Sequence, residues 1–539
     1  MKMKACEAMV ECLKAENIKV VYGYPGAAIC PFYDSLMDSG IRHVLVRHEA
    51  NAGHEASGYA RISGKPAVCI ATSGPGAVNL ITAIATAYAD SIPIICITGQ
   101  VNTEQIGSDV FQEADITGAA EPFVKHSYLI KDANELPKVF KEAFYIAGTG
   151  RPGPVLIDVP MDVQRTEIDF EYPKSVDIRS YKPTTKGNAF QVKRVMAELE
   201  KAKKPLICIG GGVFASHAEK EINELAHIMN IPVITTMMGI SAFSDDDPLF
   251  FGMLGMHGVK SANNAVNECD VLFLVGARVG DRAVRTPLEL EQTTKILHID
   301  IDPAELGKNI RVDYPLVGDA KLVLGQLIEK AKPMQHDEWL AQLDGYRVKR
   351  EFAEPAEGTV DPRQFIDRLS RAMPENTVVV ADVGQNQIWT ATGYHIGKGG
   401  RFMTSGGMGT MGYSLPAAIG AKMAAPDRPV MAICGDGSLQ MSMMELATAV
   451  QHDVRIKLVV MTNNRLGMVR ELQAKGYNGR ETAVFLDGSP DFIKLAEAYG
   501  IRSCRVTDEE SADKAIKLLI GYDGITLVEV RVDENAATL

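Results

Sequence analysis

Short apolar runs separated by helical patterns repeat along almost the whole chain. These runs are rich in β-branched residues and continuous rather than alternating in polarity, which is typical of strands buried on both faces. The clearest runs are 67–71, 92–97, 155–159, 205–209, 271–275, 378–381, 430–434 and 457–461. The pattern predicts an α/β protein whose doubly wound parallel sheets are covered by helices.

Two polar segments interrupt this rhythm and predict domain boundaries. Residues 164–188 carry two prolines, and residues 333–362 carry many charges. Such segments are typical of linkers. The chain has 539 residues, and domains usually hold about 100–200 residues each, so three units are expected. The predicted units are 1–165, 188–333 and 362–539.

Charge and cysteine content exclude several classes of protein. The net charge is −12 and no block of basic residues occurs, which argues against nucleic-acid or anionic-membrane surfaces. The sequence contains no stretch of about 18 apolar residues, so no membrane span is predicted. The nine cysteines show no C-x-x-C spacing, which favours reduced thiols in a cytoplasmic protein. The N-terminus leads into a predicted strand at 19–22 rather than an apolar signal core.

The strongest local signal lies in the last unit. A buried strand at 430–434 runs into Gly435-Asp436-Gly437-Ser438, a helical pattern follows, and a second strand at 456–461 leads to Asn463. The carboxyl ends of neighbouring parallel strands meet at one edge of a sheet, where α/β proteins bind ligands. We therefore expect Asp436 and Asn463 to lie close together.

The residue types at this edge suit a magnesium ion and a diphosphate. Carboxylate and amide oxygens are ligands that Mg²⁺ prefers, and Mg²⁺ usually also binds phosphate. Gly435 and Gly437 let a diphosphate approach the backbone, and the helix that begins after Ser438 favours anions at its N-terminus. An ordinary glycine-rich loop is the alternative, but the complete strand–helix–strand context with Asn463 favours the cofactor site.

The Gly-Asp-Gly segment followed by Asn at this distance resembles the cofactor motif of the thiamine-diphosphate enzymes. The resemblance implies that Asp436, Asn463 and the backbone carbonyl of Arg465 ligate Mg²⁺, which bridges two phosphate oxygens. Alignment on 466–468 selects Asn463 rather than Asn464 as the ligand. The family fold, with three α/β domains, agrees with the three predicted units.

Glu49 is the candidate acid that activates this cofactor. It follows the apolar run 43–46 and begins a predicted helix over 48–61. On its own it is better explained as an acid favoured at a helix start by the dipole. His48-Glu49 does not open a zinc motif, because Ala52 stands where the second histidine would be.

Other segments extend the resemblance and decide between these readings of Glu49. Residues 22–26 and 72–76 resemble the family's pyrimidine-binding domain, which implies that Glu49 hydrogen-bonds the pyrimidine ring. Segment 405–412 resembles the clamp in which Met411 bends the cofactor, although Met411 in ordinary core packing is the alternative. The implied thiamine-diphosphate residues are Pro25, Gly26, Gly74, Asn79, Gly384, Gln385, Asn386, Gly409, Met411, Gly435, Gly437, Ser438 and Met468.

The substrate side resembles the acetolactate synthases within this family. Phe111, Gln112 and Lys125 lie in segments of that type, and Gln112 is implied to position the keto acid. Arg282 matches the arginine that holds the carboxylate of the second keto acid, a task suited to bidentate contacts. A solvated surface arginine is the alternative. Together with Glu49, these are the predicted catalytic residues.

The middle unit resembles the FAD-binding members of the family. A glycine triplet at 210–212 is weak evidence alone, but the run 252–282 is more specific. The flavin is implied to be structural, because the net reaction transfers no electrons. The implied FAD residues are Gly210, Gly211, Gly255, Met256, His257, Gly276, Arg278, Asp300 and Asp319.

The chain shows three departures from the family pattern. Leu472 stands where relatives carry Trp, which predicts a more open acceptor pocket that discriminates weakly over one methylene, a difference of about 1–3 kcal/mol. Met161 replaces a usual lysine. Val279-Gly280 replaces a usual Phe-Asp beside the predicted flavin site.

The resemblance implies decarboxylation of pyruvate and ligation to a second 2-keto acid, either pyruvate or 2-ketobutyrate, in branched-chain amino acid biosynthesis. It also implies a homodimer or tetramer with active sites between subunits, and a possible small regulatory subunit. One rival is a related thiamine-diphosphate decarboxylase or carboligase, which Gln112, Arg282 and the flavin-like middle unit disfavour but Leu472 and Met161 leave open. The other is a nucleotide- or flavin-binding protein without thiamine chemistry, which Glu49 together with the pair Asp436 and Asn463 disfavours.

Overall fold

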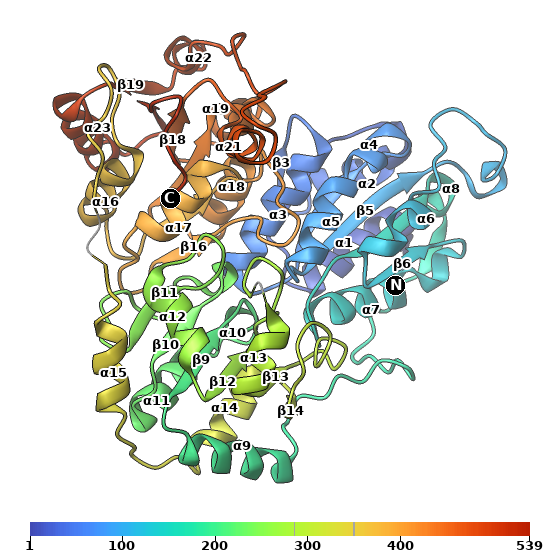
Figure 1. Cartoon of the computed structure of the whole chain (residues 1–539). Coiled ribbons are helices and arrows are strands. Elements are labelled where there is room, and N and C mark those ends of the chain that lie inside the picture. Colours follow the sequence, from blue (N-terminus) through green and yellow to red (C-terminus); the bar gives the residue numbers. More distant parts are fainter. Residues whose placement is uncertain (285, 349–350) are drawn as a thin grey trace.

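Three parallel sheets of six strands each follow one another along the chain (Figure 1). The computed structural model describes residues 1–284, 286–348 and 351–539. Each sheet has one hydrophobic core on each face: in the N-terminal sheet, Ile95 and Ile97 face one core and Ile94 and Cys96 face the other. The predicted α/β class with three doubly wound units is confirmed.

The N-terminal unit has the strand order β3-β2-β4-β5-β7-β6. Its strands are β2 Val20–Gly23, β3 Arg42–Leu45, β4 Ala67–Ala71, β5 Ile94–Gln100, β6 His126–Leu129 and β7 Val155–Pro160. Its helices are α1 Ala5–Ala15, α2 Cys30–Met37, α3 Glu49–Ser63, α4 Pro75–Asn79, α5 Ile81–Ala89, α6 Ile116–Ala120, α7 Leu136–Gly148 and α8 Met161–Arg165. A separate antiparallel pair joins β1 Lys2–Lys4 to β8 Glu167–Asp169, so the chain stays attached to this unit beyond the predicted boundary at 165.

The central unit has the order β11-β10-β9-β12-β13-β14, which in chain order is 3-2-1-4-5-6, the usual order of dinucleotide-binding sheets. Its strands are β9 Pro205–Ile209, β10 Val233–Thr235, β11 Phe250–Met253, β12 Val271–Val275, β13 Lys295–Asp300 and β14 Tyr314–Val317. Its helices are α9 Ala189–Lys201, α10 Gly212–Ala215, α11 Glu219–Met229, α12 Lys260–Glu268, α13 Pro287–Thr293, α14 Ala320–Ile328 and α15 Asp337–Asp344.

The C-terminal unit has the order β16-β15-β17-β18-β20-β19, the same chain order as the N-terminal sheet. Its strands are β15 Val378–Ala381, β16 Arg401–Met403, β17 Val430–Gly435, β18 Lys457–Thr462, β19 Arg502–Val506 and β20 Thr526–Arg531. Its helices are α16 Pro362–Ala372, α17 Gln385–Gly393, α18 Ser414–Ala424, α19 Asp436–Gln440, α20 Glu445–Gln451, α21 Gly467–Gly476, α22 Phe492–Ala498 and α23 Glu509–Gly521.

In each sheet the chain builds on one side of the first strand and then on the other, and a crevice forms at this reversal outside the carboxyl ends of the strands. The reversals lie between β2 and β4, between β9 and β12, and between β15 and β17. The segments that follow these strands contain many of the cofactor residues that the resemblance implies. They are 24–26 and 72–76, 210–212 and 276–282, and 382–386 and 435–438.

One predicted linker contains a packed helix. Helix α15 lies within 333–362, and its Trp339 is only 2% exposed, with the indole N–H donating to the Pro205 carbonyl at 3.0 Å. Leu343, four residues later, packs into the same core. The helix was not predicted from the sequence because only these two of its large side chains are buried, which leaves most of its positions polar or charged. Residues 349–350 of this linker lie outside the described residues.

Helices α3 and α18 join the N-terminal and C-terminal units through glycines at their crossing (Figure 1). A Cβ atom added to Gly58 would lie 1.9 Å from the Ala417 carbonyl oxygen, and one added to Gly420 would lie 1.8 Å from the Glu55 carbonyl oxygen. Both obstacles are backbone atoms, which cannot rotate away. The two helices therefore approach closely only because these positions carry no side chain.

The substitution Gly58→Ala is expected to lower the free energy of unfolding by about 1–3 kcal/mol or more, because overpacking forces the helices apart. Denaturant unfolding measures this change. Gly325→Ala is the matched control, since Gly325 also lies in a helix but has open space around it; there, helix propensity predicts a small gain in stability. Equal effects at the two positions would contradict the close packing of α3 on α18.

Two general properties of the chain bear on its surroundings. No helix among the described residues is both long and apolar enough to cross a membrane. All nine cysteines are free thiols. The Sγ atoms of Cys69 and Cys96, on neighbouring strands β4 and β5, lie 3.4 Å apart and fully buried.

Candidate active site

Asp436 begins α19 directly after β17, at the reversal point of the C-terminal sheet. Its carboxylate is 2% exposed and accepts the backbone N–H of Gly437 at 2.8 Å, of Asn463 at 3.1 Å and of Asn464 at 2.6 Å. Burial raises the pKa of the Asp436 carboxyl to about 6, although these hydrogen bonds oppose the shift. The structure therefore brings Asp436 and Asn463 together, as the topology predicted.

The side chain of Asn463 is held from two sides. Its Oδ1 accepts the backbone N–H of Arg465 at 3.1 Å, and its Nδ2 donates to Gln385 Oε1 at 3.1 Å. The Asp436 carboxylate and the amide oxygens of Asn463 and Gln385 thus lie together where β17 and β18 end. This donor set is chemically suited to Mg²⁺, which takes oxygen ligands.

The segment after β15, with Gly384 and the unpaired amide of Asn386, borders this cluster. Gly384, with φ 140°, adopts a backbone conformation that favours glycine, as does Gly409, with φ 72°, in the segment between β16 and α18. Asn386 is 3% exposed, and its Oδ1 has no hydrogen-bond partner among the described residues. Its Nδ2 lies 3.3 Å from the position that a Cβ on Gly435 would take. A buried unpaired polar group costs about 1–3 kcal/mol, so this loop fits a polar ligand such as a diphosphate.

A cavity of about 270 Å³ lies between the N-terminal and C-terminal units. The Met411 methyl group that borders it also lies 3.7 Å from the position of a Cβ on Gly437. Val78 and Met441 are half exposed at its rim. The lining residues are His48, Ala50, Asn51, His54, Val78, Asn79, Thr82, Thr410, Met411, Gly412 and Met441.

Asp382 holds the Met411 loop in place, and the sequence analysis missed it. It follows β15 and is 1% exposed, and its carboxylate accepts the N–H of Gly412 at 2.9 Å and of Ser414 at 2.8 Å. Burial raises its pKa against these bonds. The available signal was its position, because Asp382 follows β15 as Asp436 follows β17.

Glu49 lies at the first turn of α3 beside the glycine-rich segment after β4. Asn79 Nδ2 donates to Glu49 Oε2 at 2.9 Å, and Glu49 Oε1 lies 3.1 Å from the position of a Cβ on Gly76. His48 caps the helix through its Nδ1, which accepts the Ala50 N–H at 3.2 Å. Since Asn79 and His48 line the cavity, the Glu49 carboxylate lies next to it.

The predicted residues Gly74 and Gln112 meet at one backbone contact. A Cβ on Gly74 would lie 2.9 Å from both Cα and the carbonyl oxygen of Gln112. Gln112 has φ 61° and Gly74 has φ 58°, so both have a positive φ. The neighbouring Phe111 is 87% exposed. The loop with Gln112 therefore packs beside the segment 72–76 and presents Phe111 to the outside.

Lys125 lies away from this group. Its ammonium donates to the Ile146 carbonyl, to the Thr149 carbonyl at 2.7 Å and to Tyr181 Oη at 2.8 Å. Burial lowers its pKa to about 8. These contacts attach the chain after β8 to the end of α7, which is a structural role. The sequence could not reveal it, because Tyr181 lies far along the chain in the predicted linker.

Arg282 and the loop 255–258 meet at the surface of the central unit. The Met256 N–H donates to the Arg282 carbonyl at 2.9 Å, and Arg282 Nη1 lies 3.5 Å from Met256 Sδ. The Arg282 side chain is 72% exposed. Burial lowers the pKa of His257, and the positive charge of Arg282 adds to this shift. The negative charge of Glu471 on α21 opposes the shift, so the loop lies beside the C-terminal unit.

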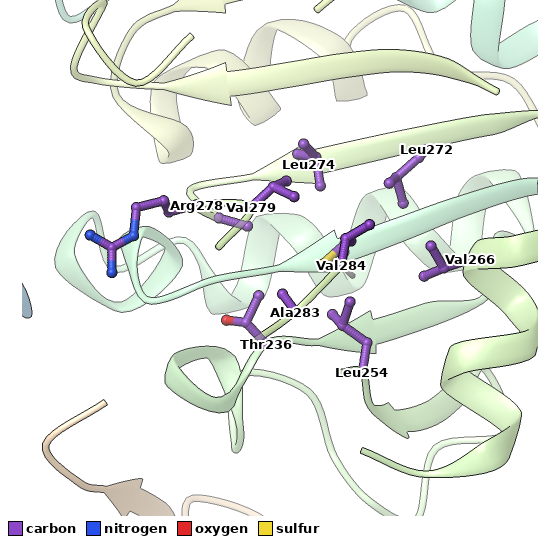
Figure 2. Close-up of a pocket in the computed structure, with 11 residues that line it drawn as sticks. Thr236, Leu254, Val266, Leu272, Leu274, Arg278, Val279, Ala283 and Val284 are labelled. Atoms are coloured by element: carbon purple, nitrogen blue, oxygen red, sulfur yellow. The ribbon is translucent and has the colours of Figure 1, made fainter. Parts of the chain in front are cut away.

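The apolar part of the central crevice is closed. Figure 2 shows its lining side chains converging, while Arg278 extends away from them. The cavity that they leave is about 10 Å³, at the lower limit for one water molecule. Gly210 and Gly212 pack against the backbone of Gly276. The lining residues are Cys208, Thr236, Leu254, Val266, Leu272, Leu274, Ala277, Arg278, Val279, Ala283 and Val284.

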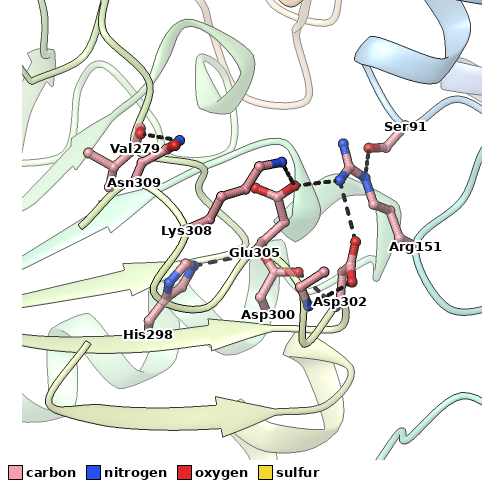
Figure 3. A network of polar contacts seen from close by, with 10 residues as sticks. Ser91, Arg151, Val279, His298, Asp300, Asp302, Glu305, Lys308 and Asn309 are labelled. Atoms are coloured by element: carbon pink, nitrogen blue, oxygen red, sulfur yellow. Dashed lines mark hydrogen bonds and ion pairs between the residues drawn. The ribbon is translucent and has the colours of Figure 1, made fainter. Parts of the chain in front are cut away.

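The polar end of the crevice carries a network of charges (Figure 3). Asp300 Oδ1 accepts the Asp302 N–H at 2.9 Å, and Arg151 of the N-terminal unit pairs with Asp302 at 3.4 Å and Glu305 at 2.8 Å. Asp319 caps α14 by accepting the Leu322 N–H at 3.1 Å. The strand order and these acids fit the polar part of a dinucleotide.

Family models match most of the chain in three consecutive parts. The model for the N-terminal TPP binding domain of thiamine pyrophosphate enzymes matches residues 3–119, and the model for their central domain matches residues 192–327. The model for their C-terminal TPP binding domain matches residues 382–530. Thiamine pyrophosphate is the same molecule as thiamine diphosphate. Each match lies within one of the three units that contain the sheets.

Curated relatives are similar along nearly the full length. A probable acetolactate synthase large subunit from Methanocaldococcus jannaschii is 44% identical, with 99% of this chain and 93% of that protein aligned. The acetolactate synthase large subunit of Haemophilus influenzae is 40% identical over 99% of this chain and 95% of its own length. The acetolactate synthase isozyme 3 large subunit of Escherichia coli is 42% identical over 92% and 89%.

Proposed function

The chain belongs to the acetolactate synthase family of thiamine pyrophosphate enzymes, and we propose that it joins two 2-keto acids with loss of carbon dioxide. Pyruvate is the proposed donor and either pyruvate or 2-ketobutyrate the acceptor, so that 2-acetolactate forms from two pyruvates. The observation that carries this proposal is the identity to acetolactate synthase large subunits over 99% of the chain. The proposed context is the first step of branched-chain amino acid biosynthesis.

Thiamine diphosphate, when bound, supplies the electron sink for decarboxylation and ligation. We propose that Asp436, Asn463 and the Arg465 carbonyl hold its Mg²⁺, since oxygen donors gather there. The unpaired amide of Asn386 supports the proposed diphosphate contact. The other proposed cofactor residues are Pro25, Gly26, Gly74, Asn79, Gly384, Gln385, Gly409, Met411, Gly435, Gly437, Ser438 and Met468.

Glu49 is the proposed acid–base residue toward the cofactor's pyrimidine ring. The hydrogen bond from Asn79 fixes its carboxylate beside the cavity. An acid that exchanges a proton with a bound group must be held at hydrogen-bond distance from it, which this contact favours. Asn79 is therefore proposed as the residue that orients Glu49.

Gln112, Phe111 and Arg282 are the proposed substrate residues. The guanidinium of Arg282 is 72% exposed and pairs with the exposed Asp281 at 3.6 Å. An exposed guanidinium can form the bidentate contact that a carboxylate needs. Leu472 is 63% exposed on α21, which agrees with an open acceptor pocket. Lys125 is assigned to the fold instead, because backbone carbonyls and Tyr181 engage its ammonium.

We propose that the active site is completed by a second copy of the chain. Val78, Met441 and Phe111 are apolar and half to largely exposed near the cavity and the Gln112 loop. Apolar side chains gathered at a rim are typical of surfaces that a partner covers. A homodimer, or a tetramer of two dimers, is the proposed state.

Because relatives are named large subunits, a small regulatory subunit is proposed as well. The proposed location is the cytoplasm, in which free thiols persist.

FAD is the third proposed cofactor, with a structural role in the central unit. The strand order 3-2-1-4-5-6 and the acids after β13 support it. The proposed residues are Gly210, Gly211, Gly255, Met256, His257, Gly276, Arg278, Asp300 and Asp319.

The purified protein is accordingly expected to carry visible flavin absorbance. Removal of the flavin is expected to lower thermal stability, since a ligand at 100 times its Kd stabilises by about 2.7 kcal/mol. Differential scanning calorimetry before and after removal measures this. Full pyruvate turnover by protein without flavin absorbance would contradict the proposed cofactor.

Analysis of products from pyruvate tests the proposed function. The protein with thiamine diphosphate and Mg²⁺ is expected to release carbon dioxide and form 2-acetolactate. Addition of 2-ketobutyrate reveals the acceptor preference in the same assay. Acetaldehyde as the main product would favour the related decarboxylases, and absence of pyruvate turnover would contradict the proposed substrate.

A further inference from the structure

The segment 533–539 runs back from β20 across α17 and α21, beside the Asp436 cluster. Thr538 is 4% exposed, and both its backbone N–H and its hydroxyl donate to Glu471 Oε1, at 2.7 and 2.6 Å. The Trp389 indole N–H donates to the Ala537 carbonyl at 3.0 Å. The end of this segment is therefore buried between the two helices that border the proposed diphosphate site.

Gln385 links this segment to the proposed metal ligand. Its Nε2 donates to Glu471 Oε1 at 2.6 Å, to the Ala536 carbonyl at 2.7 Å and to Thr538 Oγ1 at 3.3 Å. Its Oε1 accepts from Asn463 Nδ2 at 3.1 Å. A continuous series of hydrogen bonds thus runs from Thr538 through Glu471 and Gln385 to Asn463.

The series has little freedom to rearrange. Gln385 is 5% exposed, and its Oε1 lies 1.9 Å from the position that a Cβ on Gly467 would take. Two residues before Thr538 hold the segment at the surface. Glu534 pairs with Arg465 at 2.6 Å, and Asn535 accepts a hydrogen bond from Arg470 at 3.1 Å. The Asn463 amide can present either its oxygen or its nitrogen to an ion. Because Gln385 Oε1 accepts from Asn463 Nδ2, the amide nitrogen points to Gln385 and the oxygen points away from it.

We propose that Thr538, outside the cofactor site itself, is a positioning residue that orients the Asn463 oxygen toward Mg²⁺ through Glu471 and Gln385. This inference rests on the proposed function of the Asp436 cluster. Groups that orient metal ligands typically change metal affinity by about 10–100-fold when they are removed. Thr538 touches neither substrate nor cofactor, so its effect is expected on cofactor affinity and not on the rate at saturation.

The substitution Thr538→Val tests the proposal, because it keeps the branched shape and removes the hydroxyl. The apparent Kd for Mg²⁺ at saturating thiamine diphosphate is expected to rise about tenfold, while kcat at saturating cofactor stays unchanged. Thr538→Ser is expected to restore the wild-type Kd. Quenching of tryptophan fluorescence reads binding directly, since the chain has two Trp and one is Trp389.

Controls separate positioning from general destabilisation. Thr359→Val removes a hydroxyl that donates to the Ala356 carbonyl in the segment before α16, and it is expected to leave the Kd unchanged. A chain ending at Asp533 is expected to show a larger rise in Kd than Thr538→Val, and it decides the matter if Thr538→Val does not fold. An unchanged Kd in Thr538→Val or in the shortened chain would overturn the proposal.

The proposed function fails in a different way. A wild-type protein that binds thiamine diphosphate and Mg²⁺ but does not turn over pyruvate would contradict the proposed reaction and leave the role of Thr538 supported by the Kd shift. A wild-type protein that binds no thiamine diphosphate would overturn both. An active enzyme with equal Kd values for wild type and Thr538→Val would overturn only the positioning role.

Discussion

Replacement of Glu49 by glutamine is expected to lower pyruvate turnover by about 10²–10⁴-fold, the usual contribution of a positioned acid–base group. Glutamine keeps an oxygen that accepts the hydrogen bond from Asn79, which in the native chain measures 2.9 Å. The side chain therefore keeps its place beside the cavity and loses only its ability to exchange a proton. Steady-state turnover at saturating cofactor measures the effect.

A matched control separates this role from helix capping. Glu510 also lies in the first turn of a helix, α23, and its side chain is 81% exposed. Glu510→Gln changes the same charge at a helix start and is expected to leave turnover unchanged. Wild-type turnover in Glu49→Gln would mean that Glu49 is only a favourable helix-start acid.

The substitution Asp436→Ala is expected to lower the affinity for Mg²⁺ and thiamine diphosphate by at least about 100-fold, and turnover with it, because a proposed ligand is lost outright. The N–H groups of Gly437, Asn463 and Asn464 also lose the acceptor that aligns the ends of β17 and β18. Titration of thiamine diphosphate at several Mg²⁺ concentrations measures this change. Asp523→Ala, with an 86% exposed side chain, is the control; an equal loss there would contradict the site.

Mixing the two inactive variants tests where the active site is assembled. If Glu49 of one chain faces Asp436 of another, a mixed dimer of Glu49→Gln and Asp436→Ala has one site with both native residues. Random reassociation of equal amounts then restores about a quarter of wild-type turnover. If both residues act within one chain, the mixture stays inactive.

The sequence alone determined the features that depend on neighbours along the chain. Continuous apolar runs such as 67–71 and 205–209 coincide with β4 and β9, because alternate residues of these strands fill cores on both faces. The approach of Asp436 to Asn463 was also predictable, since both belong to one strand–helix–strand unit whose topology is fixed. The glycine-rich segments likewise mark the reversal points of the sheets.

Only the tertiary structure decided which distant segments meet. Lys125 reads as a substrate residue in the sequence, yet its ammonium is engaged by Tyr181 and by the end of α7. The bond between Gln385 and Thr538 joins residues 153 positions apart, and no local period records it. Local patterns report which side chains a strand or helix must bury, whereas such contacts depend on how whole units pack. For this reason several residues of the proposed site could be predicted from the sequence. The residues that hold them in place, Thr538, Glu471 and Asp382, could not.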